Sequence, residues 1–205
     1  MLIFDLFAGT GSATQAFSDA GHRVVKIELD KAFEADERDV LLLTAAYLIS
    51  KYGQPDFIWA SPPCQTFSVA SCSTYWNPDG SARDERAGAA LDLVKFTIRL
   101  IGDLNPLKGF IIENPRGMLR KQTLMADLPR QTVTYCQYGD TRMKPTDLWG
   151  SPDNWVPRLI CKNGDVCHES APRGSRTGTQ GIKKSAHRSM IPIELSRELL
   201  DAICK

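Results

Sequence analysis

The sequence predicts an α/β protein built around a doubly wound, mostly parallel sheet. Short apolar runs typical of buried strands occupy residues 2–7, 23–29, 55–60, 108–114 and 131–138. Helical patterns lie between them over 12–20, 40–51 and 86–104, and a regular alternation of strand and helix is typical of parallel sheets. Ligands of such sheets bind beyond the carboxyl ends of the strands, so functional residues are expected where these runs end.

Each element follows from a local pattern. The opening run LIFDLF reads as a buried strand entering a turn, because Gly9 and Gly11 come soon after it. The helix over 86–104 carries apolar residues at helical spacing, namely Leu91, Val94, Ile98 and Ile101. A helical pattern returns over 191–205. The polar stretches 69–86 and 150–188 break the rhythm; long loops of this kind are usually functional or disordered.

The composition fits one domain, or one domain with a small appendage. The chain has 205 residues, and its 42% hydrophobic and 24% charged residues are typical of a soluble globular protein with a real core. No apolar run is long enough to span a bilayer, and Asp5 interrupts the apolar opening, which therefore does not read as a signal peptide. Six cysteines without disulfide-scaffold spacing predict reduced thiols and a cytoplasmic location.

Charge is unevenly distributed along the chain. The net charge is +1, but residues 141–188 carry +5 while residues 1–140 carry −3. A basic segment on a near-neutral body indicates a surface for a polyanion. A solvated loop with incidental lysines explains the charge equally well, so charge alone leaves both interpretations open.

The glycine turn after the first strand predicts a nucleotide-like ligand. A strand, then Gly9 and Gly11, then a helix lets a ligand approach backbone amides closely. The third glycine of the dinucleotide fingerprint is missing, which favours S-adenosylmethionine over NAD. Glu28, at the end of the next apolar run, could bind both ribose hydroxyls or be an exposed strand-end charge. Asp39 could approach the adenine amino group or be a helix N-terminal carboxylate.

A stiffened cysteine follows the third strand. In ASPPCQTFS, Pro62 and Pro63 restrict the backbone directly before Cys64. The thiol could be a buried bystander or a nucleophile held in one place. The chain has three histidines, none in a pattern typical of a cysteine protease, so a Cys–His pair is not expected.

Glu113 ends the apolar run GFIIEN. A carboxyl group at the tip of a buried strand is costly unless something binds it. It could form a salt bridge with Arg116 or Arg120, or it could be an acid that donates to the edge of a heterocycle.

In this order and spacing, DLFAGTGS, SPPCQTFS and IIENPRG resemble the core motifs of DNA (cytosine-5)-methyltransferases, small phage or prophage members in particular. The resemblance continues through QYGDTRMKPTDLWG (137–150) and RSMIPIELSRELL (188–200) and covers nearly the whole chain. It implies a Rossmann-like, S-adenosylmethionine-dependent methyltransferase fold, and functions such as restriction-modification. The basic region would be a small irregular insertion in place of a full target-recognition domain.

The resemblance also implies a role for each motif residue. Cys64, held by Pro63, would add to carbon 6 of a cytosine flipped out of the duplex, while Glu113 would protonate or hydrogen-bond ring nitrogen 3. Asn114 would position Glu113 and the prolines, and Arg142 would lie near the base or the Cys64 adduct. The residues implied for S-adenosylmethionine, with S-adenosylhomocysteine as product, are Asp5, Phe7, Ala8, Gly9, Thr10, Gly11, Ser12, Glu28, Leu29, Asp39, Pro62 and Ser189.

Double-stranded DNA is the partner implied, bound by a monomer or weak dimer. The loop 69–86 would close over the flipped base. The expected nucleic-acid contacts are Gln65, Ser68, Tyr75, Trp76, Lys144, Arg158, Arg173, Arg176, Lys183 and Lys184. The division expected is a catalytic and cofactor-binding domain over 1–146, a reduced target-recognition region over 147–187, and a C-terminal helix over 188–205 that returns to the catalytic domain.

Several positions depart from the family pattern. The second arginine of the glutamine-arginine-arginine motif is Lys144, and Ser189 stands where an asparagine is typical. Only about 40 residues separate the arginine motif from the C-terminal motif, so sequence specificity is expected to be short or relaxed. Cys161, Cys167 and His168 could be three ligands of a structural zinc with an unidentified fourth, although ordinary thiols are favoured.

Three other functions stay open at this point. The chain could modify transfer RNA, as some family members do, or be a catalytically silent DNA-binding homologue. It could also methylate a small molecule, which the basic segment disfavours.

Overall fold

The computed structural model describes residues 1–150, 152, 154–170 and 184–205. Their strands form one sheet: β1 (Leu2–Leu6), β2 (Arg23–Ile27), β3 (Phe57–Ala60), β4 (Phe110–Pro115), β5 (Arg130–Thr134) and β6 (Pro145–Trp149). The strand order is β2-β1-β3-β4-β6-β5. The strands β2, β1, β3 and β4 pair in parallel. The strand β6 runs in the opposite direction and pairs antiparallel with β4 on one side and β5 on the other. The mostly parallel α/β fold is therefore confirmed.

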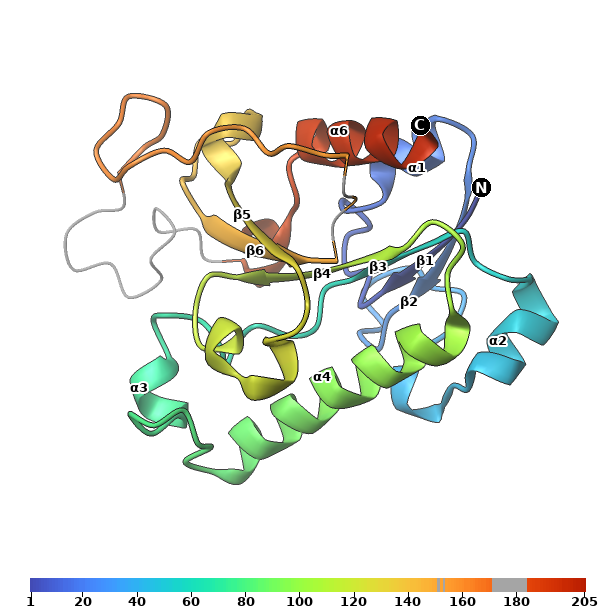
Figure 1. Ribbon diagram of the computed structural model, residues 1–205, viewed down its shortest axis with the longest axis horizontal. Helices are drawn as coiled ribbons and strands as arrows, with labels where there is room; N and C mark the ends of the chain where they lie inside the picture. Colours follow the sequence, from blue (N-terminus) through green and yellow to red (C-terminus); the bar gives the residue numbers. More distant parts are fainter. Residues whose placement is uncertain (151, 153, 171–183) are drawn as a thin grey trace.

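Helices cover both faces of the sheet (Figure 1). One face carries α1 (Gln15–Asp19) and α6 (Ile193–Cys204), and the other carries α2 (Ala45–Tyr52) and α4 (Glu85–Leu104). Two shorter helices, α3 (Cys72–Tyr75) and α5 (Ser185–Ser189), lie outside these layers. Short 3₁₀ turns occupy Val40–Leu42, Leu119–Lys121, Thr123–Met125 and Tyr135–Tyr138. No helix in the described ranges is long and apolar enough to cross a membrane.

Alternation along the strands builds a core on each face. Ile3 and Trp59 are fully buried in the α1 and α6 layer, whereas Phe4 and Ile58 are buried in the α2 and α4 layer. Burying one side chain of this size contributes roughly 1.5–3 kcal/mol. Because successive strand residues point to opposite faces, Glu113 shares the α1 and α6 face of the sheet with Ile111.

Local sequence sets the limits of the longest helix. Asp84 precedes α4, and its carboxylate accepts a hydrogen bond from the amide of Ala87 (3.0 Å). Asn105 ends the helix in the left-handed region at φ 44°, a conformation that asparagine tolerates better than most residues.

Two elements differ from the sequence prediction. The run 131–138 is a strand only to Thr134, after which the chain turns into the 3₁₀ helix Tyr135–Tyr138. The strand β6 was not predicted at all. It is only five residues long, it begins with a proline, and its central residue Asp147 is fully buried. Arg120 neutralises that charge, which a local hydrophobic pattern cannot reveal. Because β6 continues to Trp149, the sheet extends past the boundary proposed at residue 146.

Candidate active site

The register of the sheet brings three chain segments to one edge. The strands β3 and β4 are parallel neighbours, so their carboxyl ends lie together and lead to Cys64 and Glu113. The strand β6 runs the opposite way, and its first residues pair with Pro115 of β4 and Thr134 of β5. Lys144, which immediately precedes β6, is therefore placed at the same edge as the thiol and the carboxyl group.

Glu113 is a buried acid with neutral hydrogen-bond donors. Its side chain is 5% exposed, and the Tyr135 hydroxyl donates to Oε1 at 3.1 Å. Burial raises the pKa of Glu113 above its usual value, against the opposing effects of the Lys144 charge and of hydrogen bonds from Tyr135 and Ser61. The proton is thus retained to higher pH than on an exposed glutamate.

The expected alternative partners of Glu113 are engaged elsewhere or exposed. Arg120 pairs with Asp147 through Nε at 2.8 Å and also reaches the Thr132 hydroxyl. Arg116 is exposed. Within the described ranges, neither arginine forms an ion pair with Glu113.

Cys64 lies half-buried in the same electrostatic environment. Burial raises the pKa of its thiol, and the Glu113 charge raises it further, while Lys144 and Arg188 lower it. Cys64 and Glu113 therefore interact across one site rather than lying in separate parts of the molecule.

The loop carrying Cys64 is fixed to β4 at two points. Asn114 donates from Nδ2 to the carbonyl of Pro62 at 2.9 Å, and both residues are buried. Farther along, the amide of Met118 donates to the carbonyl of Phe67 at 2.7 Å. Gly117 makes this approach possible, because a Cβ there would overlap that carbonyl oxygen.

Lys144 belongs to this cluster, in addition to any nucleic-acid contact it was expected to make. Its Nζ lies 4.5 Å from the centroid of the Tyr135 ring. Burial lowers the pKa of Lys144, while Glu113 and Cys64 raise it, as expected for a cation placed between an acid and a thiol. Its backbone has φ 29°, where the chain turns into β6.

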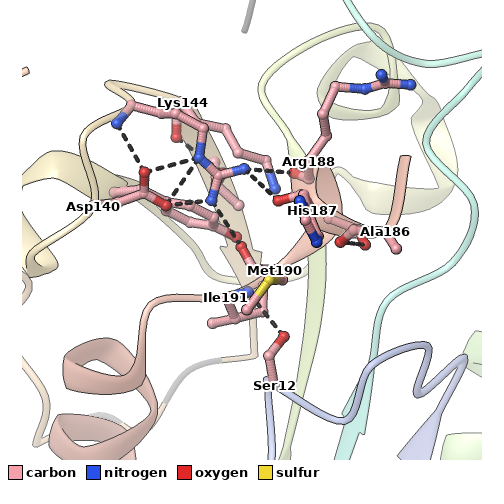
Figure 2. A network of polar contacts seen from close by, with 12 residues as sticks. Ser12, Asp140, Lys144, Ala186, His187, Arg188, Met190 and Ile191 are labelled. Carbon is pink, nitrogen blue, oxygen red and sulfur yellow. Dashed lines mark hydrogen bonds and ion pairs between the residues drawn. The ribbon is translucent and has the colours of Figure 1, made fainter. Parts of the chain in front are cut away.

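The Arg142 guanidinium is held by Asp140 and by the C-terminal segment, and it lies 6.0 Å from the centroid of the Tyr135 ring. It is buried, forms an ion pair with Asp140, and donates to the carbonyls of His187 (2.9 Å), Arg188 (3.0 Å) and Met190 (3.2 Å). Figure 2 shows this network joining Asp140 to the segment 187–190. Arg142 thus holds the C-terminal segment in place, and its expected position near the base or the Cys64 adduct stays a prediction.

The glycine loop after β1 has an unusual backbone. Phe7, Gly9 and Gly11 have φ of 65°, 50° and 73°, and the two glycines adopt these values without a Cβ clash. The amide of Gly9 donates to Glu28 Oε2 at 2.7 Å, and the amide of Asp30 donates to Oε1 at 2.8 Å. The Glu28 carboxylate thus sits beside the loop, where a ribose diol could share it. A Cβ at Gly9 would meet nothing within 4 Å, so the approach to this backbone is open.

Polar residues connect this loop to the interior and to the C-terminal segment. Asp5 is fully buried, Thr14 Oγ1 donates to its Oδ2 at 2.6 Å, and burial raises the pKa of Asp5 to about 7. The amide of Ile191 donates to the Ser12 hydroxyl at 3.0 Å (Figure 2). The Ser196 hydroxyl donates to the carbonyl of Ala13 at 2.7 Å.

The other residues expected to bind the cofactor differ in their exposure and in the hydrogen bonds that they form. Leu29 is 66% exposed, and Thr10 is also exposed, whereas Ala8 is buried. Asp39 caps the turn Val40–Leu42 by accepting from the amide of Leu41 at 3.0 Å, which is the structural alternative considered for it. The Ser189 hydroxyl donates to the carbonyl of Ala186 at 2.8 Å.

Two of the residues expected to contact nucleic acid, Trp76 and Arg158, form contacts within the protein. Trp76 is 2% exposed, stacks on Phe67 with ring centroids 5.4 Å apart, and donates from Nε1 to the carbonyl of Thr66. Arg158 forms ion pairs with Glu194 and Glu198, and its contact with nucleic acid stays a prediction.

The other expected contacts vary in accessibility. Gln65 and Pro63 are exposed, Ser68 is half-buried, and the half-buried Tyr75 has the Arg86 guanidinium 5.0 Å from its ring centroid. Lys184 is exposed beside α5. Arg173, Arg176 and Lys183 lie outside the described residues.

Three residues of these networks were not predicted from the sequence. Tyr135 and Ser61 hydrogen-bond to Glu113, and Asp140 pairs with Arg142. Cys136, likewise unremarked, joins Cys161, Cys167 and His168 in one cluster. Tyr135 and Cys136 looked like ordinary strand residues, and no local pattern would have distinguished them.

Taken together, a mostly parallel sheet with one antiparallel strand, a glycine loop after β1 and a polar site at the strand ends defines a Rossmann-like methyltransferase fold. Residues 1–128 match the family model described as C-5 cytosine-specific DNA methylase. A "Probable DNA (cytosine-5)-methyltransferase" of Frog virus 3 (isolate Goorha) is 30% identical over 220 residues, covering 98% of this chain and 99% of the viral protein. The chain therefore belongs to the C-5 cytosine-specific DNA methylase family.

Solved structures of similar fold are more distant in sequence. A triple mutant of Spodoptera frugiperda DNMT2 gives a TM-score of 0.49 at 17% identity, over 78% of this chain and 56% of that protein. The S. pombe Dnmt2 methyltransferase gives a TM-score of 0.48 at 17% identity, over 78% of this chain and 53% of that protein. The chain thus matches little more than half the length of these two structures.

Proposed function

We propose that the protein transfers a methyl group from S-adenosylmethionine to carbon 5 of a cytosine in double-stranded DNA, through a transient covalent adduct with Cys64. The observation that carries this proposal is the shared site of Cys64, Glu113 and Lys144 at the ends of β3, β4 and β6. A nucleophile, an acid and a cation together suit an addition to an aromatic ring that is otherwise unreactive.

The chemistry follows from the charge balance of the site. The sulfur of Cys64 attacks carbon 6 as a thiolate, and the negative charge it brings moves through the ring toward nitrogen 3. Glu113, whose pKa burial raises above its usual value, donates a proton or a hydrogen bond to that nitrogen. Carbon 5 then becomes electron-rich and accepts the methyl group. Loss of the carbon 5 proton and departure of Cys64 restore the aromatic ring.

Lys144 and Asn114 support this chemistry in two different ways. The Lys144 cation lowers the pKa of the Cys64 thiol and offsets the opposing charge of Glu113. Asn114 holds the Pro62 carbonyl, which keeps the proline-stiffened loop against β4. Fixing a nucleophile in this way matters because a misplacement of about 1 Å costs roughly 100-fold in rate.

The residues around the first glycine turn fit S-adenosylmethionine. The Glu28 carboxylate would accept hydrogen bonds from the ribose hydroxyls, and the open backbone of Gly9 allows close approach. When bound, S-adenosylmethionine supplies an activated methyl group on its sulfonium. The C-terminal segment, tied to Ser12 and Ala13, would hold this loop in shape.

DNA is the favoured polymer. The viral relative is named as a probable DNA methyltransferase, and residues 141–188 carry a net charge of +5 suited to phosphates. A cytosine inside a duplex must be flipped out at a cost of roughly a few kcal/mol. The loop 69–86, which carries α3 and the half-buried Tyr75, would close over it.

Product analysis tests the proposal. Incubation with isotope-labelled S-adenosylmethionine and duplex DNA should yield labelled 5-methylcytosine by nucleoside mass spectrometry, and Cys64→Ala should abolish it without loss of cofactor binding. Cys204→Ala, which changes an exposed thiol at the end of α6, is the control and should retain activity. Label found on RNA alone, or in neither polymer, would contradict the proposal.

Trapping tests the covalent step separately. DNA containing 5-fluorocytosine cannot lose a proton from carbon 5, so the adduct should remain attached to Cys64 and be recovered on that peptide. Methylated DNA formed without any such adduct would reject the role assigned to the thiol while leaving the overall reaction intact.

A further inference from the structure

Four sulfur and nitrogen ligands from two chain segments meet beside β5. Cys136 comes from the 3₁₀ turn Tyr135–Tyr138, while Cys161, Cys167 and His168 come from the segment 155–169 that runs past it (Figure 1). The four ligand atoms all lie within 4.8 Å of one another. Three of these residues are close together in the sequence, and the fold brings the fourth, Cys136, beside them.

The separations match those around a tetrahedral zinc ion. Cys136 Sγ lies 3.1 Å from Cys161 Sγ and 3.6 Å from Cys167 Sγ. His168 Nδ1 lies 3.8 Å from Cys161 Sγ and 3.6 Å from Cys167 Sγ. With Zn–S bonds of about 2.3 Å and Zn–N bonds of about 2.0–2.1 Å, tetrahedral geometry puts ligand atoms about 3.5–3.8 Å apart. Small shifts, chiefly a lengthening of the 3.1 Å distance between the Cys136 and Cys161 sulfurs, would complete the tetrahedral geometry.

The surroundings also suit a metal better than a network of thiols. Cys136 and Cys161 are buried, and thiols make only weak hydrogen bonds to one another. Gln137 Nε2 donates to the sulfur of Cys167 at 3.4 Å, a contact that would stabilise a thiolate bound to a cation. His168 Nε2 is buried without a hydrogen-bond partner in the described ranges, so Nδ1 facing the sulfurs carries the ring's polar interactions.

The segment 155–169 lacks a core of its own. Its buried apolar side chains are Trp155 and Cys161, whereas Val156, Leu159, Ile160 and Val166 are at least half exposed. A few polar contacts hold it to the sheet, such as Cys161 N to Thr134 Oγ1 (3.2 Å) and Glu169 N to Thr141 O (2.8 Å). Small regions of this kind commonly rely on a metal or a disulfide for stability.

We propose that Cys136, Cys161, Cys167 and His168 bind one structural Zn²⁺ ion through three sulfurs and Nδ1 of the imidazole. The thiols release their protons to solvent on binding, and the neutral imidazole uses its lone pair. Sulfur-rich tetrahedral sites select zinc over magnesium or calcium, and four protein ligands leave no open position for catalysis. The ion fastens the segment 155–169 to the turn that follows β5.

Metal analysis of the full chain tests the site. Reduced protein passed through a desalting column should retain about one Zn²⁺ per chain by inductively coupled plasma mass spectrometry. Cys167→Ser, which leaves both buried cysteines intact, should lower this at least about tenfold. Cys204→Ser changes an exposed thiol outside the cluster and should retain the metal.

Cobalt provides a readout independent of the stability of any variant. Co²⁺ replacing zinc in the unaltered chain should give the strong visible absorption of a tetrahedral site and sulfur-to-cobalt charge transfer, and Cys167→Ser should lose both. A wild-type chain that is folded, reduced and metal-free would overturn the proposal. So would a disulfide between Cys136 and Cys161, or full metal retention in Cys167→Ser.

Discussion

Lys144 and Arg142 show how two basic residues of one short motif divide between two tasks. They lie two positions apart, and the positive φ at Lys144 turns the chain into β6 just after them. Lys144 Nζ is placed over Tyr135 near Glu113 and Cys64, while Arg142 is bound to Asp140 and to three carbonyls of the C-terminal segment. Their charges are equal, so only the surrounding backbone decides which one acts on the thiol.

This arrangement predicts opposite effects of two substitutions on Cys64. Lys144→Met removes a cation that lowers the pKa of the thiol, so the pKa should rise further. Glu113→Gln removes a charge that raises it, so the pKa should fall. The pH dependence of iodoacetamide alkylation, followed on the Cys64 peptide by mass spectrometry, measures both. An unchanged thiol pKa in both variants would show that burial alone sets the reactivity.

Glu113→Gln should nevertheless reduce methyl transfer by about 100-fold or more, because it removes a general acid. The variant would then hold a more readily ionised thiol and yet be a poorer catalyst. This combination separates the acid function of Glu113 from any effect on the nucleophile.

Asp5 predicts a pH-dependent stability. Its pKa is about 7 in the folded chain against 3.8 for the ordinary group, so folding favours the protonated form. The resulting stability is complete below about pH 4 and is lost as pH rises through about 7, a difference of up to about 4 kcal/mol. Asp5→Asn, which can still accept from Thr14, should therefore gain stability relative to wild type between about pH 5 and about pH 8. Urea denaturation of both proteins at the two pH values measures this. A difference in midpoint between Asp5→Asn and wild type that is the same at both pH values would contradict the assignment.

At the scale of elements, the loop after β3 depends on the segment after β4. Asn114 and Met118 on one side hold Pro62 and Phe67 on the other, so the thiol between them has little freedom. The reactive geometry is therefore a property of two loops packed together, and neither has it alone.

Gly117→Ala should disturb this contact, because the new methyl group would overlap the backbone carbonyl of Phe67. We expect a loss of about 100-fold in methyl transfer and roughly 1–3 kcal/mol of stability, since backbone must move to make room. Gly88→Ala, inside α4 with nothing within 4 Å of its Cβ, is the matched control and should be neutral or slightly stabilising. Steady-state rates and urea denaturation measure both, and an unaffected Gly117→Ala enzyme would show that the loop tolerates displacement.

At the scale of the whole molecule, the fold class was predictable because buried parallel strands and amphipathic helices leave plain periodic patterns. The antiparallel β6 was not, since its buried Asp147 depends on Arg120 from another segment. The motifs predict Cys64 and Glu113 at one sheet edge, and the parallel pairing of β3 and β4 is consistent with that prediction. The roles of Arg158 and Cys136 depend on contacts between segments far apart in sequence, and no local pattern encodes them.

The position of α6 has a consequence for synthesis in the cell. Figure 1 shows α6 beside α1, and Ser196 hydrogen-bonds to Ala13 across 183 positions of the chain. On the ribosome, this face of the sheet therefore has only part of its cover until residues 193–204 have emerged from the exit tunnel. Until then the nascent chain carries Phe57 and Trp59 without their final cover, a period in which chaperones or early aggregation compete with folding.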